Sequence, residues 1–169
     1  SVLKDENSKS TFTSIGTGTD GFYGVFDGRG FRILGLTANG DDAGLFSKLT
    51  SKEDNTASSG GDLRRGTVRD LRIYSSNFSG TKSAGAVAGV NEGGVISGVT
   101  TLGNHVEATG KNGADTGVQD VRGAAGGIVG INKGEIKGSD ASDVVVAGGA
   151  NVTAGGVAGV NAEGGLIGT

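Results

Sequence analysis

The chain has 169 residues, of which 34% are hydrophobic and 5% aromatic, and its formal net charge is −3. Its 36 glycines occur without proline and without a strict three-residue period, which excludes a collagen helix and a proline-rich linker. The lack of cysteine excludes disulfides, thiolate metal sites and cysteine nucleophiles. The weak negative charge does not indicate binding to nucleic acid or to an anionic membrane. No apolar run is as long as the about 18 residues that a membrane span needs.

The N-terminal stretch is polar up to Ser10 and has no signal-peptide core, so we expect regular structure to begin near Thr11. From Thr11 to Leu36, aromatic and β-branched residues alternate with glycine and polar residues, as in strands and turns. Five of the eight aromatic side chains fall in this stretch: Phe12, Phe22, Tyr23, Phe26 and Phe31. We expect residues 1–36 to form a cap that closes the end of a core, or else the first coil of that core.

The next segments contain the first, degenerate copy of a repeated unit. Residues 43–49 read AGLFSKL and align with later, clearer copies. Residues 50–66 are rich in Ser, Gly and charge, which predicts a loop that projects from the fold. Residues 66–73, GTVRDLRI, return to a strand alternation with Val68, Leu71 and Ile73 as inward candidates.

Three clear copies follow. They read AGAVAGVNEGGVISG at 84–98, AGGIVGINKGEIKG at 125–138 and AGGVAGVNAEGGLIG at 154–168. Each copy predicts strand, turn and strand, and a unit that cannot bury its own apolar face must stack on its neighbours. Disorder is the alternative, but the glycines keep fixed offsets from Val, Ile and Leu, which disordered segments do not.

The spacing of the second strands predicts the fold. Their inner positions, Ile33, Val68, Ile96, Ile136 and Ile167, are separated by 35, 28, 40 and 31 residues. A coil of three short strands and three turns uses about 28 to 31 residues, and insertions explain the longer spacings. We therefore expect an all-β fold without significant helix: a right-handed parallel β-helix (β-solenoid) of about five coils. Residues 37–169 would form one continuous repeat domain, in a chain excised from a longer protein.

One strand does not follow simple alternation. In GGIVGIN, the apolar residues Ile128 and Ile131 have opposite parity. We favour a β-bulge at Gly130, because glycine recurs at the equivalent positions Gly89 and Gly159. The alternative is a strand that is covered on both faces.

An asparagine ends this strand in every clear copy, at Asn91, Asn132 and Asn161. The three should fall at one corner of successive coils, where stacked side-chain amides could hydrogen-bond up a ladder. The simpler explanation, which we favour, is that asparagine tolerates a left-handed turn.

The three copies resemble the GLUG repeat of large bacterial surface and secreted proteins, and the resemblance covers about residues 24–169. GVFDGRGFRILGL followed by AGLFSKL is similar to the segment that often leads into such repeats. Similar repeats occur in adhesin-like proteins and in non-catalytic regions of immunoglobulin A1-type peptidases, which implies an extracellular, bacterial cell-surface or secreted setting. The copies here have Val or Ile where the name-giving motif has Leu.

Catalytic chemistry has few candidates. Asp20, Asp27, Asp41 and Asp42 are compatible with a polysaccharide-cleaving enzyme, which sets carboxylates on one face. Asp20, Asp27 and Asp41 each adjoin a glycine, and Asp42 follows Asp41. Solvated turns are therefore the favoured interpretation of all four aspartates. His105 is the only histidine and is expected on a strand with its ring outward, without a partner to orient it or enough ligands for zinc.

Metal and anion sites are also weakly indicated. Calcium is possible at Asp140 and Asp143, or at Glu53 and Asp54, but the nonapeptide calcium repeat is absent. We therefore expect no catalytic, cofactor or metal site and no cofactor. A basic stripe for an anionic glycan, or a merely solvated face, is predicted from four arginines: Arg64, Arg65, Arg69 and Arg72.

The unequal coil lengths indicate where a partner would bind. The surplus residues fall in 51–65 and 103–123, and partners are usually recognised by loops on a rigid scaffold. The ligand-contacting candidates are Lys52, Arg64, Arg65, His105, Lys111 and Gln119. We expect a non-enzymatic extracellular module of an adhesin-like protein, acting as a stalk or as a display surface for a host-cell surface, extracellular matrix or glycan ligand, next to other domains of a larger parent. It would bind no nucleic acid and insert into no membrane. The alternative is a fragment of a carbohydrate-active enzyme or a non-catalytic module of a secreted peptidase.

Overall fold

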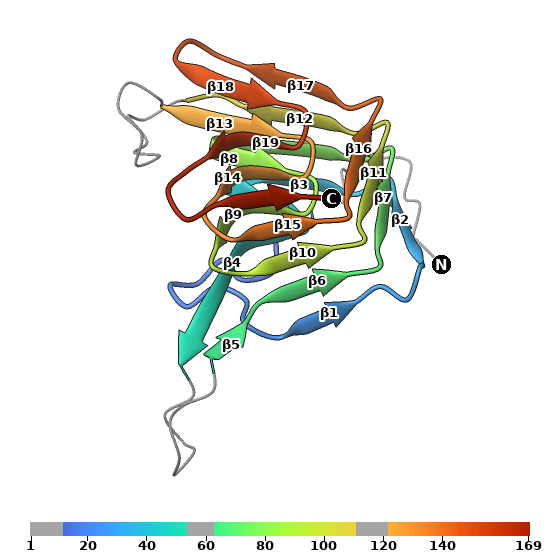
Figure 1. The fold of residues 1–169 in the computed structure, drawn as a ribbon. Coiled ribbons are helices and arrows are strands. Elements are labelled where there is room, and N and C mark those ends of the chain that lie inside the picture. Colours follow the sequence, from blue (N-terminus) through green and yellow to red (C-terminus); the bar gives the residue numbers. More distant parts are fainter. Residues whose placement is uncertain (1–11, 54–62, 111–121) are drawn as a thin grey trace.

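The computed structural model of the chain describes residues 12–53, 63–110 and 122–169. Within these residues the chain forms strands, turns and bends and no helix, as the glycine content predicts. The strands pair almost entirely in parallel between successive passes of the chain, an arrangement that fits a β-solenoid (Figure 1). The all-β, parallel architecture expected from the repeats is thus confirmed.

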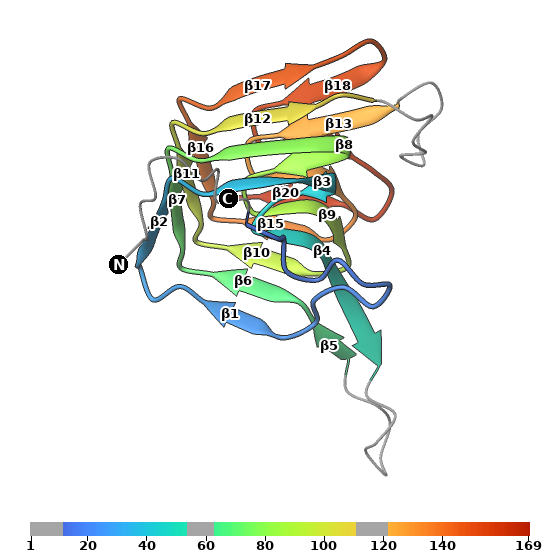
Figure 2. The same cartoon turned by 180° about the vertical axis from the view of Figure 1, so that it is seen from behind.

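The strands lie in four sheets, which the chain visits in turn (Figures 1 and 2). The first sheet contains β1 (Val25–Asp27), β6 (Thr67–Arg69), β10 (Val95–Ser97), β15 (Glu135–Lys137) and β20 (Leu166–Gly168). The second contains β2 (Arg32–Leu34), β7 (Arg72–Tyr74), β11 (Thr100–Leu102) and β16 (Asp140–Ser142). The third contains β3 (Thr37–Ala43), β8 (Asn77–Gly85), β12 (His105–Ala108), β13 (Gly123–Gly126), β17 (Val145–Gly148) and β18 (Val152–Gly155). The fourth contains β4 (Phe46–Glu53), β9 (Ala88–Glu92), β14 (Val129–Asn132) and β19 (Ala158–Asn161), with β5 (Leu63–Arg65) antiparallel to β4.

The inner column of the first sheet is mostly the expected one. Val68, Ile96, Ile136 and Ile167 are direct neighbours in the parallel register. The expectation for Ile33 is wrong, because Phe26 is the partner of Val68 and Ile33 pairs with Ile73 in the second sheet. Phe26 and Ile33 are the apolar centres of β1 and β2, on either side of the turn at 28–31. From the sequence alone, either could be the inward residue of the first sheet.

Each complete pass contains four or five strands rather than the predicted three, because the repeated stretch is itself two strands and the later passes place two strands in the third sheet. In AGGIVGIN, β13 ends at Gly126, the chain reverses at 127–128, and β14 begins at Val129. Ile128 therefore belongs to the turn, which removes the parity conflict with Ile131. The pairing of β14 with β9 runs without a register shift, so the predicted bulge at Gly130 is wrong.

Gly130 is required instead by a close approach between sheets. A Cβ atom there would lie 2.8 Å from the Ala84 nitrogen and 2.9 Å from the Ala124 oxygen, both in strands of the third sheet. All four residues of β14 are buried, so this strand is covered on both faces, which was the second alternative. Val129 belongs to the main apolar core, whereas Ile131 belongs to a smaller apolar cluster with Val90, Ala124 and Val160.

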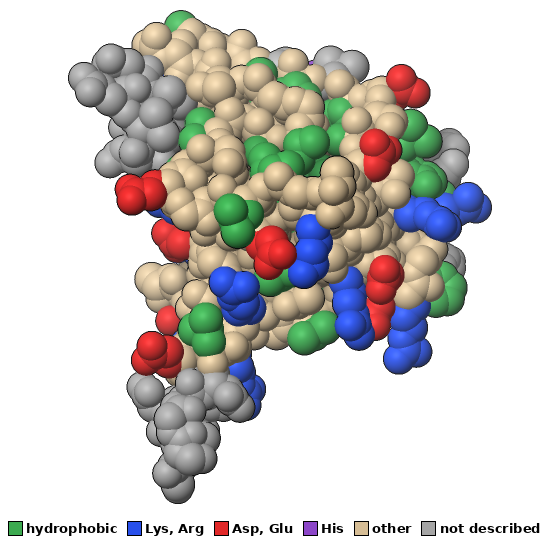
Figure 3. All heavy atoms as spheres, viewed as in Figure 1, with side chains coloured by type: hydrophobic (Ala, Val, Ile, Leu, Met, Phe, Trp, Pro, Cys, Tyr) green, Lys and Arg blue, Asp and Glu red, His purple; other side chains and the backbone are tan. Residues whose placement is uncertain are grey.

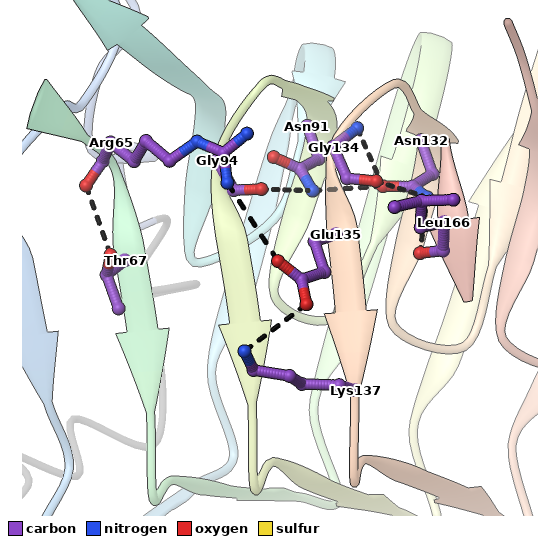
Figure 4. A network of polar contacts seen from close by, with 9 residues as sticks. All are labelled: Arg65, Thr67, Asn91, Gly94, Asn132, Gly134, Glu135, Lys137 and Leu166. Atoms are coloured by element: carbon purple, nitrogen blue, oxygen red, sulfur yellow. Dashed lines mark hydrogen bonds and ion pairs between the residues drawn. The ribbon is translucent and has the colours of Figure 1, made fainter. Parts of the chain in front are cut away.

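The three asparagines form the ladder that the sequence allowed, and Figure 4 shows its first step, from Asn91 to Asn132. Asn91 Nδ2 donates to Asn132 Oδ1 at 2.9 Å, and Asn132 Nδ2 donates to Asn161 Oδ1 at 2.8 Å. None of the three has a positive φ, so the simpler explanation by a left-handed turn is wrong. The ladder starts at Asn91, whose buried Oδ1 has no hydrogen-bond partner, because its neighbour in β4 is Leu49.

The residues before β1 lie against the third and fourth sheets. Phe12, Ile15 and Phe22 form parallel bridges to Ala38, Phe46 and Leu49. The Phe22 and Phe26 rings contact Phe46, with centroids 4.7 and 5.6 Å away. Tyr23 and Phe31 lie outside the core, 38% and 75% exposed, so not all five N-terminal aromatic residues close the apolar interior.

The burial of β15 yields a stability prediction. Ile136 is 1% exposed between the outward-facing Glu135 and Lys137. Ile136→Asp should lower the free energy of unfolding by more than about 3 kcal/mol, because it buries an unpaired charge. Lys137→Ala should change it by less than about 1 kcal/mol. Urea unfolding of both variants tests this, and equal midpoints would contradict the inward orientation of Ile136.

The asparagine ladder predicts different effects of one substitution at its middle and its end. Asn132→Asp removes the amide that donates to Asn161 and places a buried carboxylate beside acceptor oxygens, at a cost of about 3 kcal/mol. Asn161→Asp keeps the accepting oxygen at an exposed position, so it should cost less than about 1 kcal/mol. The pKa of an aspartate at position 132 would be raised in the folded chain. Its destabilisation should therefore be relieved at acidic pH and grow as the pH rises above about 4. Thermal unfolding at pH 3.5 and pH 7 measures both effects.

Candidate functional site

The first insertion continues a sheet and does not leave the fold as a simple loop. Ser51 and Lys52 at the end of β4 pair with Arg65 and Arg64 of β5 in an antiparallel hairpin. Residues 54–62, which include Asp54 of the possible calcium pair, lie outside the described residues. Ser51, Lys52 and Glu53 are all exposed and extend β4 beyond its pairing with β9, which ends at Thr50.

The candidate basic residues of this hairpin already have partners. Lys52 Nζ lies 3.5 Å from Asp20 and 5.2 Å from the centre of the Tyr23 ring. Arg65 lies 3.9 Å from Glu135 (Figure 4), and the exposed Arg64 also has an interaction partner. Exposed pairs of this kind contribute between about 0 and 1 kcal/mol each, so a ligand could displace them cheaply.

The second insertion begins later than predicted. Gly103 and the buried Asn104 form a corner of the fold, where Asn104 Oδ1 accepts from the Ser76 N–H and Asn104 Nδ2 donates to the Ile73 carbonyl. His105 follows in β12 and is exposed, as expected, on the third sheet. Lys111 and Gln119 lie outside the described residues. The structure therefore does not bring His105 together with Lys52, Arg64 and Arg65, which lie on the hairpin of the fourth sheet.

The four aspartates considered for catalysis are separated. Asp20 pairs with Lys52, and Asp27 pairs with Arg69 at 2.9 Å. The Arg29 backbone N–H also donates to Asp27, and this bond first, followed by the Arg69 guanidinium, holds the pKa of the Asp27 carboxyl below its ordinary value. Asp41 and Asp42 are not in a solvated turn, because they lie in β3 where its register with β8 shifts.

Asp41 and Asp42 line a cavity of about 500 Å³, which is the strongest candidate for a ligand site among the described residues. The cavity lies between β3, the start of β4 and the N-terminal residues 12–17. Backbone hydrogen bonds hold this N-terminal segment in place, from Phe12 to Thr37 at 2.8 Å and from Ile15 to Leu45 at 3.0 Å. The lining residues are Phe12, Thr13, Ser14, Thr17, Asn39, Gly40, Asp41, Asp42 and Ser47.

Hydrogen bonds hold three of the polar side chains that line the cavity. Thr81 Oγ1 donates to Asp41 Oδ1 at 2.6 Å, and Ser83 Oγ donates to Asp42 Oδ1 at 2.5 Å. The buried Ser14 hydroxyl donates to the Gly44 carbonyl at 2.7 Å. These bonds engage one oxygen of each carboxylate, and the lining of the cavity contains no Lys, Arg or His.

The lining matches the chemistry of a sugar. Two carboxylates, four hydroxyls and one amide offer many acceptors and several donors, and Phe12 supplies an aromatic surface. Neutral or amino sugars carry many hydroxyl donors, whereas an anionic ligand would meet only negative charge. Sequence reasoning singled out Asp41 and Asp42 but missed the cavity, because its residues come from two segments whose pairing is not visible before the fold is known.

No other chemistry is evident in the described parts of the chain. They hold no group of three or more His, Cys, Asp or Glu side chains that could bind a metal ion, and Asp140 Oδ2 accepts from the Ser142 hydroxyl. None of their elements is a helix long and apolar enough to cross a membrane.

Comparison of the chain with protein-family models, curated proteins and solved structures finds no match. The resemblance to GLUG repeats therefore stays a prediction.

The contacts of Asp27 predict its titration. A lowered folded-state pKa means that the Asp27 contacts add stability above the ordinary value of 3.8, and that this stability is lost as the pH falls below it. Arg69→Gln should raise the carboxyl pKa part of the way back, because the Arg29 N–H bond remains. NMR titration of the Asp27 carboxyl carbon measures this, and an unchanged pKa in Arg69→Gln would show that the ion pair does not form in solution.

Proposed function

We propose that this chain is a non-enzymatic extracellular module of a bacterial adhesin-like surface protein, and that it displays a glycan-binding pocket on a rigid stalk. The scaffold is a right-handed β-solenoid of about five coils. Crossovers between parallel strands are right-handed in nearly all proteins, and the first sheet has five strands, which supports this description. Stacked coils give stiffness and reach, while loops and ends remain free to bind.

The cavity at Asp41 and Asp42 is the observation that carries the binding function. It is concave, its carboxylates are held by hydroxyls of β8, and its walls come from β3, the start of β4 and residues 12–17. Its size suits a ligand of one or two sugar units. We assign it to a neutral or amino sugar, because the lining residues are uncharged or acidic.

A carbohydrate-active enzyme fragment is the second candidate, since two carboxylates border the cavity. Glycosidases place an acid and a second carboxylate on opposite sides of the scissile bond. Asp41 and Asp42 are instead consecutive residues of one strand, and each is held by its own hydroxyl. This arrangement suits binding better than an acid and nucleophile pair. A non-catalytic module of a secreted peptidase would share the scaffold and the pocket.

A glycan array of neutral, amino and acidic oligosaccharides tests the binding function. We expect binding of a neutral or amino glycan, weakened at least about tenfold by Asp42→Asn, which removes a charged hydrogen-bond acceptor. Phe12→Leu should weaken the same glycan through loss of the aromatic face. Asp20→Asn, an equal charge change on the hairpin side, is the matched control and should leave binding unchanged.

Three outcomes would overturn parts of this proposal. Release of reducing sugar from a bound glycan, abolished by Asp41→Asn, would favour the enzyme. Unchanged glycan binding in both pocket variants, with loss after residues 54–62 are replaced by a short glycine bridge, would move the site to the hairpin. Absence of glycan binding in the intact chain would remove the pocket's proposed role.

A further inference from the structure

A second surface differs in charge from the pocket. The corner between the first and second sheets, formed by residues 25–34 and 67–74, contains four arginines and two aspartates. Figure 3 shows basic side chains gathered over this side of the molecule, around β1, β2 and their neighbours. Arg69 is paired with Asp27, which leaves Arg29, Arg32 and Arg72 against Asp70. The corner is thus locally positive on a chain whose net charge is −3.

Two of these arginines are direct neighbours of equal charge. Arg32 of β2 and Arg72 of β7 are parallel register partners, and both point outward beside the inward-facing Ile33 and Ile73. Like charges in such neighbouring positions destabilise a sheet unless an anion lies between or over them. Arg72 Nη1 donates to the Gly30 carbonyl at 3.2 Å, whereas the Arg32 guanidinium has no partner within the described residues.

The turn between β1 and β2 is longer than its counterpart and is firmly held. Residues 28–31 take the place of the two residues 70–71 in the next pass. Gly28 and Gly30 donate backbone hydrogen bonds to Arg69 and Asp70, at 2.8 and 2.6 Å, and Asp27 Oδ1 accepts from Arg29. Arg29 adopts a positive φ of 49°, a strained conformation for a residue other than glycine. The fold therefore fixes an exposed arginine at the tip of this turn.

Phe31 adds an aromatic surface beside the arginines. It is 75% exposed, although the turn that holds it is ordered by the bonds above, and it precedes Arg32 directly. An exposed aromatic ring can stack on the apolar face of a sugar ring, while neighbouring guanidinium groups pair with carboxylate or sulfate. Isolated exposed aromatic residues are common, but here the ring adjoins unpaired positive charge on a rigid corner.

We propose that Arg29, Phe31, Arg32 and Arg72 form a binding surface for an acidic polysaccharide, distinct from the pocket at Asp41 and Asp42. Strands stack at about 4.8 Å, so Arg32 and Arg72 present two guanidinium groups at a spacing that successive acidic groups of an extended glycan can follow. The net negative charge of the chain disfavours a long duplex nucleic acid or a membrane surface, both of which would contact more than this corner.

Binding of fluorescent heparin oligosaccharide to the purified chain, measured from low salt to about 0.15 M salt, tests the surface. We expect binding that weakens with salt, and a loss of at least about tenfold in the double variant Arg32→Thr/Arg72→Thr. Arg29→Gly, which suits the positive φ, and Phe31→Ser should each weaken binding several-fold. Lys82→Gln in β8, an equal loss of charge per residue on the third sheet, is the control and should change binding less than twofold. Neutral dextran should not compete.

Stability separates a binding role from a structural one. Arg32→Thr removes a like-charge neighbour and adds a residue suited to strands, so its thermal midpoint should be unchanged or higher while heparin binding falls. A lower midpoint with unchanged binding would overturn the proposal, as would equal weakening by Lys82→Gln. Tighter binding of single-stranded RNA or of phosphatidylserine vesicles than of heparin would also overturn it. Pocket variants such as Asp42→Asn should leave heparin binding intact, so this surface and the proposed pocket can fail independently.

Discussion

The close approach of the third and fourth sheets is the constraint on which the rest of the structure depends. The chain reverses within two residues at 127–128, so β13 and β14 face each other with backbone almost against backbone. A Cβ at Gly130 would lie within 2.9 Å of three backbone atoms, which leaves glycine as the residue that fits. Thr101 of β11 donates to the Gly127 carbonyl at 3.1 Å and so ties this reversal to the second sheet. Small residues here replace the large side chains of an ordinary core, which explains how a chain with 34% hydrophobic residues closes a folded interior.

Other features of the molecule follow from this packing. It carries Asn91 and Asn132 into buried positions at the end of their strands, where amides can be satisfied only by one another and by nearby carbonyls. The close packing of the two sheets also involves a residue of the candidate pocket, because a Cβ at Gly89 would lie 2.7 Å from the Asp42 Cβ. The carboxylate positions of the pocket therefore depend on a glycine in another strand. The shape of the candidate pocket and the packing of the scaffold therefore depend on the same contact.

The two proposed surfaces use the scaffold in different ways. The candidate pocket lies where residues 12–17 adjoin β3 and β4, and its lining carries two carboxylates and no basic side chain. The corner arises where one turn is longer than its counterpart, and it concentrates unpaired arginines. Both depend on local departures from the repeat, while the regular parts supply fixed spacing and orientation. A repetitive scaffold can therefore carry distinct ligand chemistries without a change in its core.

The sequence by itself determined the all-β architecture, the parallel stacking of the repeats, and the inner column of Val68, Ile96, Ile136 and Ile167, because these follow from periodicity and glycine content. It left the asparagine ladder as one of two explanations. Only the tertiary structure decided that AGGIVGIN is two strands, that Phe26 replaces Ile33 in the inner column, and that Gly130 serves close packing. It also decided the candidate sites, because Phe12 and Asp42 border one cavity, and Arg32 lies beside Arg72, only through pairing between segments distant in sequence. The periodicity of the sequence indicates which side of a strand is apolar. Which distant segments become neighbours depends instead on the lengths of turns and insertions, and these lengths leave no periodic pattern in the sequence.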